Sequence, residues 1–363
     1  MLINIQFLRF AAALAVVIYH ASKHVAMTGA NQGLLFSAGE AVGFAGVDVF
    51  FVISGFIMFY TTEQTGGGVS SIDFLKRRLA RIYSGYWPFF LLAAGVFAWA
   101  RPEHFQSANL LTSWLLWPMP LNQVLLDVSW TLSYELYFYV LFAALVLLGL
   151  RLRWWLIVAT LLTLTGFNLF RHFILQDFSP ERMYNFSFAN QFLTSPFLLE
   201  FFAGAAVAAV ASRRTFGSGW LLLLAGLAGF ALAGVVNTLG YDGKIEQGYH
   251  VVPRVLLFGT PSVLILLGLL QLEKNGRVAP ENFSLQAGGA SYAIYLSHTI
   301  FLVATMKLGL NSALSELPDL VVQICFSLYC ALIVAFSMGW YRYIERPLHQ
   351  RFKRGLRIKR PSS

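Results

Sequence analysis

Long apolar stretches recur along the whole chain and are the main structural signal in the sequence. Ten of them approach or exceed the roughly 20 mostly apolar residues that a helix needs to cross the bilayer core of about 30 Å. No basic residue precedes the first stretch and Arg9 lies inside it, so we expect a helix there and not a signal peptide. The pattern predicts an all-α, polytopic membrane protein of about ten transmembrane helices, near residues 5–22, 41–61, 83–100, 129–150, 154–170, 191–211, 219–239, 254–271, 287–306 and 320–343.

The composition agrees with this fold class. Of the 363 residues, 57% are hydrophobic, 16% are aromatic and 12% are charged, whereas an ordinary globular domain has about 25% charged residues. One soluble core of this size cannot bury the apolar surface of 33 Phe, 15 Tyr and 9 Trp. This excludes a soluble enzyme, a disordered protein, a collagen-like fibre and a disulfide scaffold. Cys325 and Cys330 share one apolar stretch and are interpreted as helix-packing residues.

Lys and Arg are distributed unevenly between the loops. With a cytoplasmic N-terminus, 17 of the 26 fall in inside segments and 7 in outside loops, Arg254 among the latter. The positive-inside rule therefore predicts that both termini are cytoplasmic. The net charge of +9 requires no nucleic acid, because a basic tail beside a membrane contacts anionic lipid headgroups. We expect one transmembrane domain, residues 1–345, and a basic cytoplasmic tail, residues 346–363.

Charged side chains at membrane depth cost at least a few kcal/mol each and mark candidate functional positions. Arg9 and His20 are eleven positions apart in the first span, so a helix carries them on one face about 16 Å apart. Alternatively, Arg9 is a snorkelling anchor and His20 an outer-edge residue. In the second span, Asp48 lies among aromatic residues, and its alternative role is a structural salt bridge to an Arg. Gly55, seven positions later, would let another helix come close.

Three further groups of polar residues lie in or beside the spans. Arg77, Arg78 and Arg81 form a cluster at the cytoplasmic mouth of the third span, at spacings of three and four residues. Guanidinium groups bind phosphate oxygens bidentately, although orientation signals have the same composition. Glu135, in the fourth span, is flanked by tyrosine hydroxyls, and Glu200 is another carboxylate within a span.

Ser291, Tyr295 and His298 follow one face of the ninth span. Such a stripe lines a cavity or, alternatively, holds two helices together by hydrogen bonds. Metal-ligand spacings do not occur within the spans, so no metal is expected. The other histidines fall in loops or the tail and are given no role: His24, His104, His172, His250 and His349.

Taken together, these segments resemble the acyltransferase-3 family of bacterial integral-membrane O-acyltransferases, most of all its short members that acetylate exopolysaccharides. The resemblance implies transfer of an acyl group, usually acetyl from acetyl-CoA, to a sugar hydroxyl in the cell envelope, at the bacterial cytoplasmic (inner) membrane. Larger relatives carry an extra-cytoplasmic hydrolase-like domain, which we do not expect here. The matching blocks are Arg9 to His20, Gly46 to Phe56, Arg77 to Tyr83, Trp130 to Tyr139, Glu200 to Gly204, Ser291 to His298 and Tyr343 to Pro347.

The polar residues fit this reaction. Arg77, Arg78 and Arg81 would hold the phosphates of acetyl-CoA at the inner mouth, and Arg9 would steer the thioester.

His20 is the candidate general base, because an imidazole can take a proton from an alcohol that attacks a thioester. Either Asp48 or Glu135 would orient its ring. The stripe on the ninth span would bind the sugar or the developing oxyanion, through Ser291, Tyr295 and His298.

Two other functions fit the same pattern. Ten spans with a polar interior also describe a carrier or flippase for a lipid-linked sugar, which would transport without acyl transfer. An acyltransferase with another donor, such as succinyl-CoA, or another acceptor, such as peptidoglycan, a glycolipid or a small molecule, is the second alternative.

Overall fold

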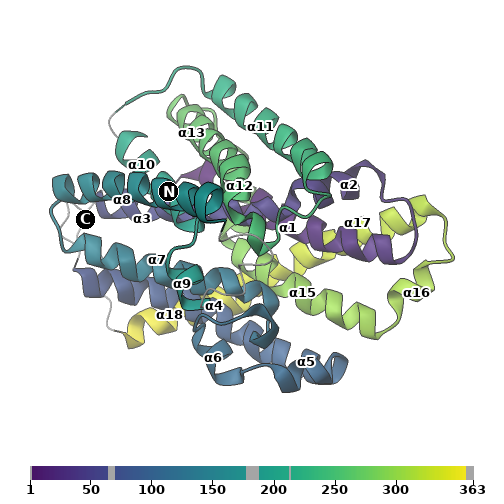
Figure 1. The fold of residues 1–363 in the computed structure, drawn as a ribbon. Coiled ribbons are helices and arrows are strands. Elements are labelled where there is room, and N and C mark those ends of the chain that lie inside the picture. Colours follow the sequence, from purple (N-terminus) through teal and green to yellow (C-terminus); the bar gives the residue numbers. More distant parts are fainter. Residues whose placement is uncertain (1, 64–69, 177–187, 212–213, 357–363) are drawn as a thin grey trace.

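The computed structural model describes residues 2–63, 70–176, 188–211 and 214–356, and these residues form helices and connecting segments without a β-strand (Figure 1). The long helices are α1 (Ile3–Met27), α3 (Gly46–Glu63), α4 (Ser71–Ala100), α7 (Trp130–Val146), α8 (Leu150–Phe170), α10 (Phe197–Ala211), α11 (Gly219–Gly240), α13 (Thr260–Lys274), α15 (Ser291–Lys307) and α17 (Asp319–Trp340).

Shorter helices and helical turns connect them. The helices are α2 (Gly33–Val42), α5 (Pro102–Ser107), α6 (Leu110–Leu115), α9 (Phe188–Leu193), α12 (Val251–Arg254), α14 (Glu281–Gly289), α16 (Leu310–Leu314) and α18 (Arg346–Gly355). The turns are η1 (Gly43–Ala45), η2 (Leu121–Gln123), η3 (Asp127–Ser129), η4 (Arg171–Leu175), η6 (Gly248–His250), η7 (Val255–Gly259) and η8 (Tyr341–Glu345).

The predicted fold class is confirmed. Nine helical segments among the described residues are long and apolar enough to cross a membrane, and α14 with α15, bent by 52°, makes a tenth. Each of the ten coincides with one predicted apolar stretch.

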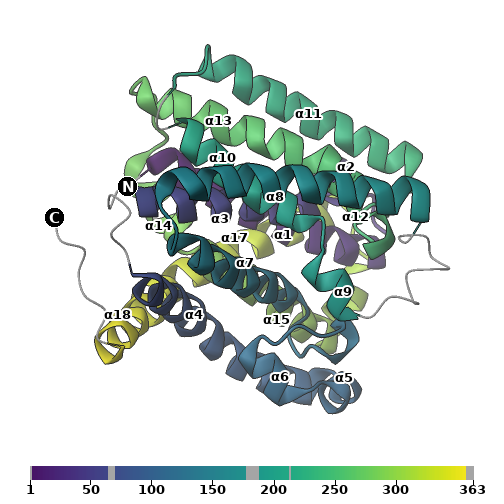
Figure 2. The same ribbon diagram turned by 60° about the vertical axis from the view of Figure 1, so that its left-hand side comes forward.

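The helices form a layered bundle. The pair α11 and α13 lies along one side, α3, α8 and α10 cross the middle, and α4 lies on the opposite side with α5, α6 and α18 (Figures 1 and 2). Helix α1 packs against α2, α3, α14, α15 and α17, so the first span is inside the bundle.

The main hydrophobic core uses the high aromatic content of the chain. The ring of Phe138 on α7 lies between those of Phe51 on α3 and Phe201 on α10, with centroid distances of 5.3 and 4.5 Å. All three side chains are buried. Aromatic pairs at these distances contribute about 0.5–1.5 kcal/mol beyond their buried area, so they fix α7 against the α3–α10 pair.

Helices α3 and α10 are in backbone contact through two glycines. A Cβ atom on Gly55 would collide with the carbonyl of Phe201, and one on Gly204 with the carbonyl of Val52. Small residues allow this approach between membrane helices, where close packing replaces the hydrophobic effect. The predicted close helix approach at Gly55 is confirmed.

The segment predicted as a basic tail begins as a helix. Helix α17 continues through the π-helical turn η8 into α18, which packs on α4. The ring of Phe352 lies 5.6 Å from that of Trp87. Residues 357–363 of the tail lie outside the described residues.

We predict that Gly55→Ala destabilises the protein by about 1–3 kcal/mol, because the new methyl group meets backbone atoms that cannot rotate away. Heating the purified protein in detergent and measuring the fraction that stays monodisperse tests this. Gly95→Ala, in α4, is the matched control, since nothing lies within 4 Å of its added Cβ. Equal thermal stability of the two variants would contradict the packing argument.

Candidate active site

A cavity of about 750 Å³ lies between α1, α3, α4, α7, α15 and α18. At one end its wall contains the exposed residues Thr61, Ser70 and Lys353. At the other end its wall is formed by buried residues such as Val47 and Tyr295. The cavity therefore enters the bundle beside α4 and α18 and ends inside it.

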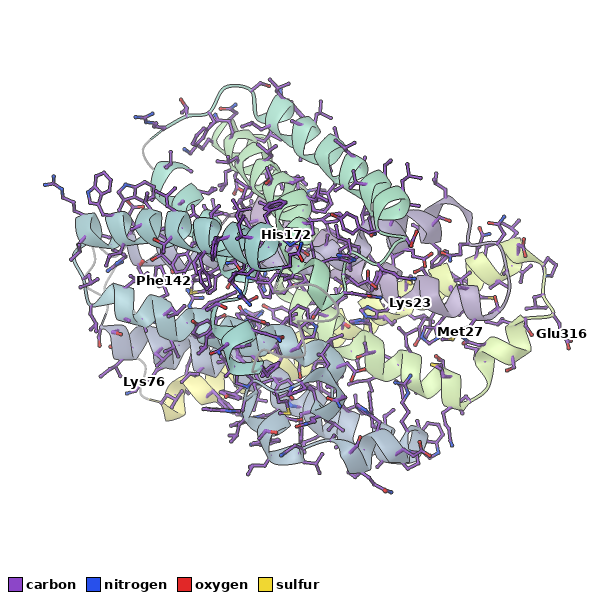
Figure 3. All side chains as sticks on the ribbon, viewed as in Figure 1. Lys23, Met27, Lys76, Phe142, His172 and Glu316 are labelled. Atoms are coloured by element: carbon purple, nitrogen blue, oxygen red, sulfur yellow. The ribbon has the colours of Figure 1, made fainter. Side chains whose placement is uncertain are left out.

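The two ends of the bundle carry different parts of the predicted site. Lys76, on α4 near the cavity entrance, lies at the opposite end of the bundle from Lys23 and Met27 of α1 (Figure 3). On α1, Arg9 lines the cavity. His20 is eleven residues closer to the Lys23 end, about 16 Å further along the helix axis.

Most of the candidate site residues predicted from the sequence line the cavity. Its wall includes one cation from α1, three from α4, one carboxylate from α7 and two hydroxyl groups from α15: Arg9, Arg77, Arg78, Arg81, Glu135, Ser291 and Tyr295. His20, Asp48 and His298 are not part of that wall.

Arg9 and Glu135 differ in their bonding. Glu135 accepts hydrogen bonds from the hydroxyl of Tyr139 and, at 3.3 Å, from the hydroxyl of Ser54. Arg9 donates to the side chain of Gln6 at 3.3 Å and makes no ion pair within the part of the chain that the structure describes. A guanidinium group without a carboxylate partner, facing a cavity, is suited to bind a carbonyl or phosphate oxygen of a ligand.

Arg81 and Arg78, on α4, bind other side chains of the protein. Arg81 donates to Glu345 at 2.7 Å, and Arg78 donates to the hydroxyl of Thr61 at 3.1 Å. Glu345 is fully buried at the end of η8. Arg81 therefore neutralises a buried carboxylate in addition to lining the cavity.

Helix α18 adds two residues that the sequence analysis missed. His349 and Lys353 both line the cavity, and the ring of His349 lies 3.2 Å from the hydroxyl of Ser84. His349 was given no role, and Lys353 was assigned to a tail. One helix face carries Glu345, His349 and Lys353, because they are spaced by four residues. This spacing is the feature of the sequence that could have predicted a polar helix face here.

Asp48 is the partner of Arg254 and not of His20. The guanidinium binds the carboxylate with Nη2–Oδ2 at 2.6 Å and Nε 3.2 Å from both oxygens. Both side chains are buried, and the rings of Phe44 and Phe197 lie 5.1 Å from the guanidinium. The structural salt bridge left open for Asp48 is therefore present. Arg254, expected in an outside loop, instead lies inside the bundle on α12.

Glu200 on α10 is buried like Asp48 and Glu345, and it does not line the cavity.

His20 has a histidine, not a carboxylate, as its neighbour. Nδ1 of His20 lies 3.0 Å from the carbonyl oxygen of Val16 and 3.2 Å from Nε2 of His298. Nδ1 of His298 lies 3.3 Å from the carbonyl oxygen of Ile294. Neither Asp48 nor Glu135 has a hydrogen bond to His20 in the described residues, so the expected carboxylate–imidazole pair is replaced by a pair of imidazoles.

Tyr295 connects the cavity to this histidine pair. Its hydroxyl donates to the carbonyl of Val128 at 2.9 Å and accepts from the hydroxyl of Thr131 at 3.0 Å. Its ring lies 6.0 Å from that of Phe50, another cavity residue, and 5.9 Å from that of His298. The stripe on α15 thus lines the cavity at Ser291 and Tyr295 and reaches the pair at His298.

Comparison with known proteins identifies the family. A family model described as an acyltransferase domain, Acyl_transf_3, matches residues 2–340. The chain is 31% identical to the exopolysaccharide production protein ExoZ of Rhizobium meliloti (strain 1021), over 88% of this chain and 95% of that protein. The chain belongs to the acyltransferase-3 family. No solved structure matches it.

Membership of the acyltransferase-3 family confirms the predicted enzyme class: the protein is a multi-pass membrane O-acyltransferase. Acyl transfer, and not transport alone, is therefore the activity of this protein. Among the described residues, no group of three or more His, Cys, Asp or Glu could hold a metal ion.

We predict that Asp48→Asn or Arg254→Gln alone destabilises the acyltransferase by about 3–5 kcal/mol, because each leaves one buried charge without its partner. The double variant should recover much of that loss, since neither charge is then buried. Thermal unfolding in detergent measures the four proteins of this cycle. Additive losses in the double variant would contradict the assignment of Asp48 and Arg254 to one structural ion pair.

Proposed function

We propose that this acyltransferase transfers an acetyl group from acetyl-CoA to a sugar hydroxyl of an exported or cell-envelope polysaccharide, or of its lipid-linked precursor. The reaction takes place in the bacterial cytoplasmic membrane, and His20 is the general base. The proposal rests mainly on one observation: a single cavity leads from a cluster of cations at its open end to Tyr295, beside the histidine pair. The name of the relative ExoZ, an exopolysaccharide production protein, supports the choice of acceptor.

The open end of the cavity suits the nucleotide half of the donor. Arg77, Arg78 and Arg81 on α4 and Lys353 on α18 line it from two sides, and the phosphates of acetyl-CoA are strongly anionic. Because Arg81 is already paired with Glu345, we assign the phosphates chiefly to the other three cations. In this proposal the open end faces the cytoplasm, where acetyl-CoA is found, as the positive-inside rule predicts.

The narrow pantetheine arm would extend along the cavity toward Tyr295. Arg9 lies about 16 Å from His20 along the axis of α1, so in this proposal Arg9 binds an amide carbonyl of the arm and does not contact a thioester placed beside His20. Glu135, held by Ser54 and Tyr139, belongs to the same wall. We therefore assign Glu135 to the donor cavity and not to His20.

The acceptor would reach His20 from the opposite end of the bundle. His20 is only partly buried and lies beyond the Tyr295 end of the cavity. The acceptor hydroxyl oxygen attacks the thioester carbonyl carbon, and its proton passes to His20. The carbon–sulfur bond breaks, and the coenzyme A thiolate takes up the proton from His20. Donor and acceptor thus meet from the two sides of the membrane, with Tyr295 at the point that the acetyl group has to pass.

We predict that His20→Ala lowers acetyl transfer by a hundredfold or more, about the contribution of a general base. Proton NMR of the surface polysaccharide measures O-acetyl content in a deletion strain complemented with each variant. His24→Ala, one turn further on α1, is the control, because His24 bonds to Asn311 away from the cavity and should retain acetylation. Near-normal acetylation by His20→Ala would rule out the base assignment.

We predict that the variant Arg77→Ala/Lys353→Ala raises the KM for acetyl-CoA about tenfold or more and changes kcat less, because two phosphate contacts are lost. Arg354→Ala removes a cation from the same helix, but this exposed residue does not line the cavity. Membrane vesicles supplied with radiolabelled acetyl-CoA or succinyl-CoA measure both constants. An equal rise of KM in Arg354→Ala would contradict the phosphate site, and preferred incorporation of succinyl label would replace the assigned donor.

A further inference from the structure

His298 occupies a position that a substrate cannot reach. Its side chain is fully buried, and it is not part of the cavity wall. Both of its ring nitrogens already have protein neighbours, the carbonyl of Ile294 at Nδ1 and the ring of His20 at Nε2. A residue with these contacts can influence the reaction only through His20.

The hydrogen bonds fix which nitrogen of each ring carries a proton. The carbonyl oxygen of Ile294 only accepts, so Nδ1 of His298 is protonated and its Nε2 has the lone pair. The carbonyl of Val16 likewise requires a proton on Nδ1 of His20. Two acceptors lie within reach of that proton, because Nδ1 of His20 is 3.0 Å from the oxygen of Val16 and 3.2 Å from Nε2 of His298. Nε2 of His20 is therefore the unprotonated atom of the neutral ring.

We propose that His298 is a positioning residue: by accepting a hydrogen bond from Nδ1 of His20, it holds that ring in the tautomer whose Nε2 takes the proton of the acceptor hydroxyl. This inference rests on the proposed role of His20 as general base. It replaces the role of substrate ligand that the sequence suggested for His298.

The arrangement resembles a catalytic triad in which the third member, His298, is neutral. In a serine hydrolase triad, a buried carboxylate accepts from Nδ1 of the base and stabilises the imidazolium that forms. Here Nε2 of His298 accepts from Nδ1 of His20. A neutral ring avoids placing another charge at membrane depth, which would cost several kcal/mol.

The proton transfers balance within this pair of histidines. His20 gains the hydroxyl proton on Nε2 while keeping its Nδ1 proton, and it then gives the Nε2 proton to the departing thiolate. His298 keeps its own proton on Nδ1, bonded to Ile294, throughout. His298 therefore ends each cycle as it began, without exchanging a proton with solvent.

Two variants of equal polarity separate this role from simple helix packing. In His298→Gln, the side-chain oxygen can extend to about the position of Nε2 and accept from His20. In His298→Asn, the same amide is one methylene shorter and falls short of His20. His298→Leu removes the acceptor altogether.

The test uses membrane vesicles of the deletion strain complemented with full-length protein, radiolabelled acetyl-CoA as donor and the polysaccharide fraction as the readout. We expect His298→Asn and His298→Leu to lower kcat about tenfold to a hundredfold, with the KM for acetyl-CoA changed by less than about twofold. His298→Gln should recover kcat to within about fivefold of the natural protein. Size-exclusion profiles in detergent establish that the variants compared are folded.

Equal kcat for folded His298→Gln and His298→Asn, whether both are high or both are low, would overturn the positioning role. If His298→Leu does not fold, the Gln and Asn variants still decide the question. Failure of the underlying proposal gives a different result, because His20→Ala itself would then remain active. An inactive His20→Ala together with fully active His298 variants would remove His298 from the mechanism and leave His20 in place.

Discussion

A polar group inside a membrane has to be paired with another group or face a hydrated cavity, and this constraint organises the whole bundle. Asp48 is paired with Arg254, and Glu345 with Arg81. Arg153, buried to 1% exposure, donates to three carbonyl groups at the end of α7. Among the described residues, Arg9 has no carboxylate within ion-pair distance, and it lines the cavity.

The sequence was sufficient for those features that depend on one helix at a time. Apolar length predicted all ten candidate spans found in the described residues, the bent pair α14–α15 included. The missing side chain of Gly55 predicted the close contact that α10 makes there. The rarity of charge in a span singled out Arg9 and Glu135, which do line one cavity. The spacing of Ser291, Tyr295 and His298 predicted one polar face on α15, and two of the three reach the cavity.

Features that depend on which helices are neighbours could not be predicted in this way. Asp48 and Arg254 are 206 positions apart, and His20 and His298 are 278 apart. Periodicity shows which face of a helix is polar, but it does not identify the helix that this face meets. Glutamate and aspartate were expected beside His20 because carboxylates are the usual partners of a catalytic imidazole. Lys353 was read as part of a tail because the same basic composition marks the cytoplasmic side of any membrane protein.

In the proposed mechanism, the cavity that opens between α4 and α18 holds the acyl donor with its thioester directed inward. An electron cryo-microscopy structure of the full-length protein with coenzyme A tests this most directly. We expect nucleotide density between α4 and α18, in contact with Arg77 and Lys353, and the thiol end of the pantetheine arm beside Tyr295. Nucleotide density at the Lys23 end of the bundle, or a pantetheine arm that leaves the cavity without passing Arg9, would contradict it.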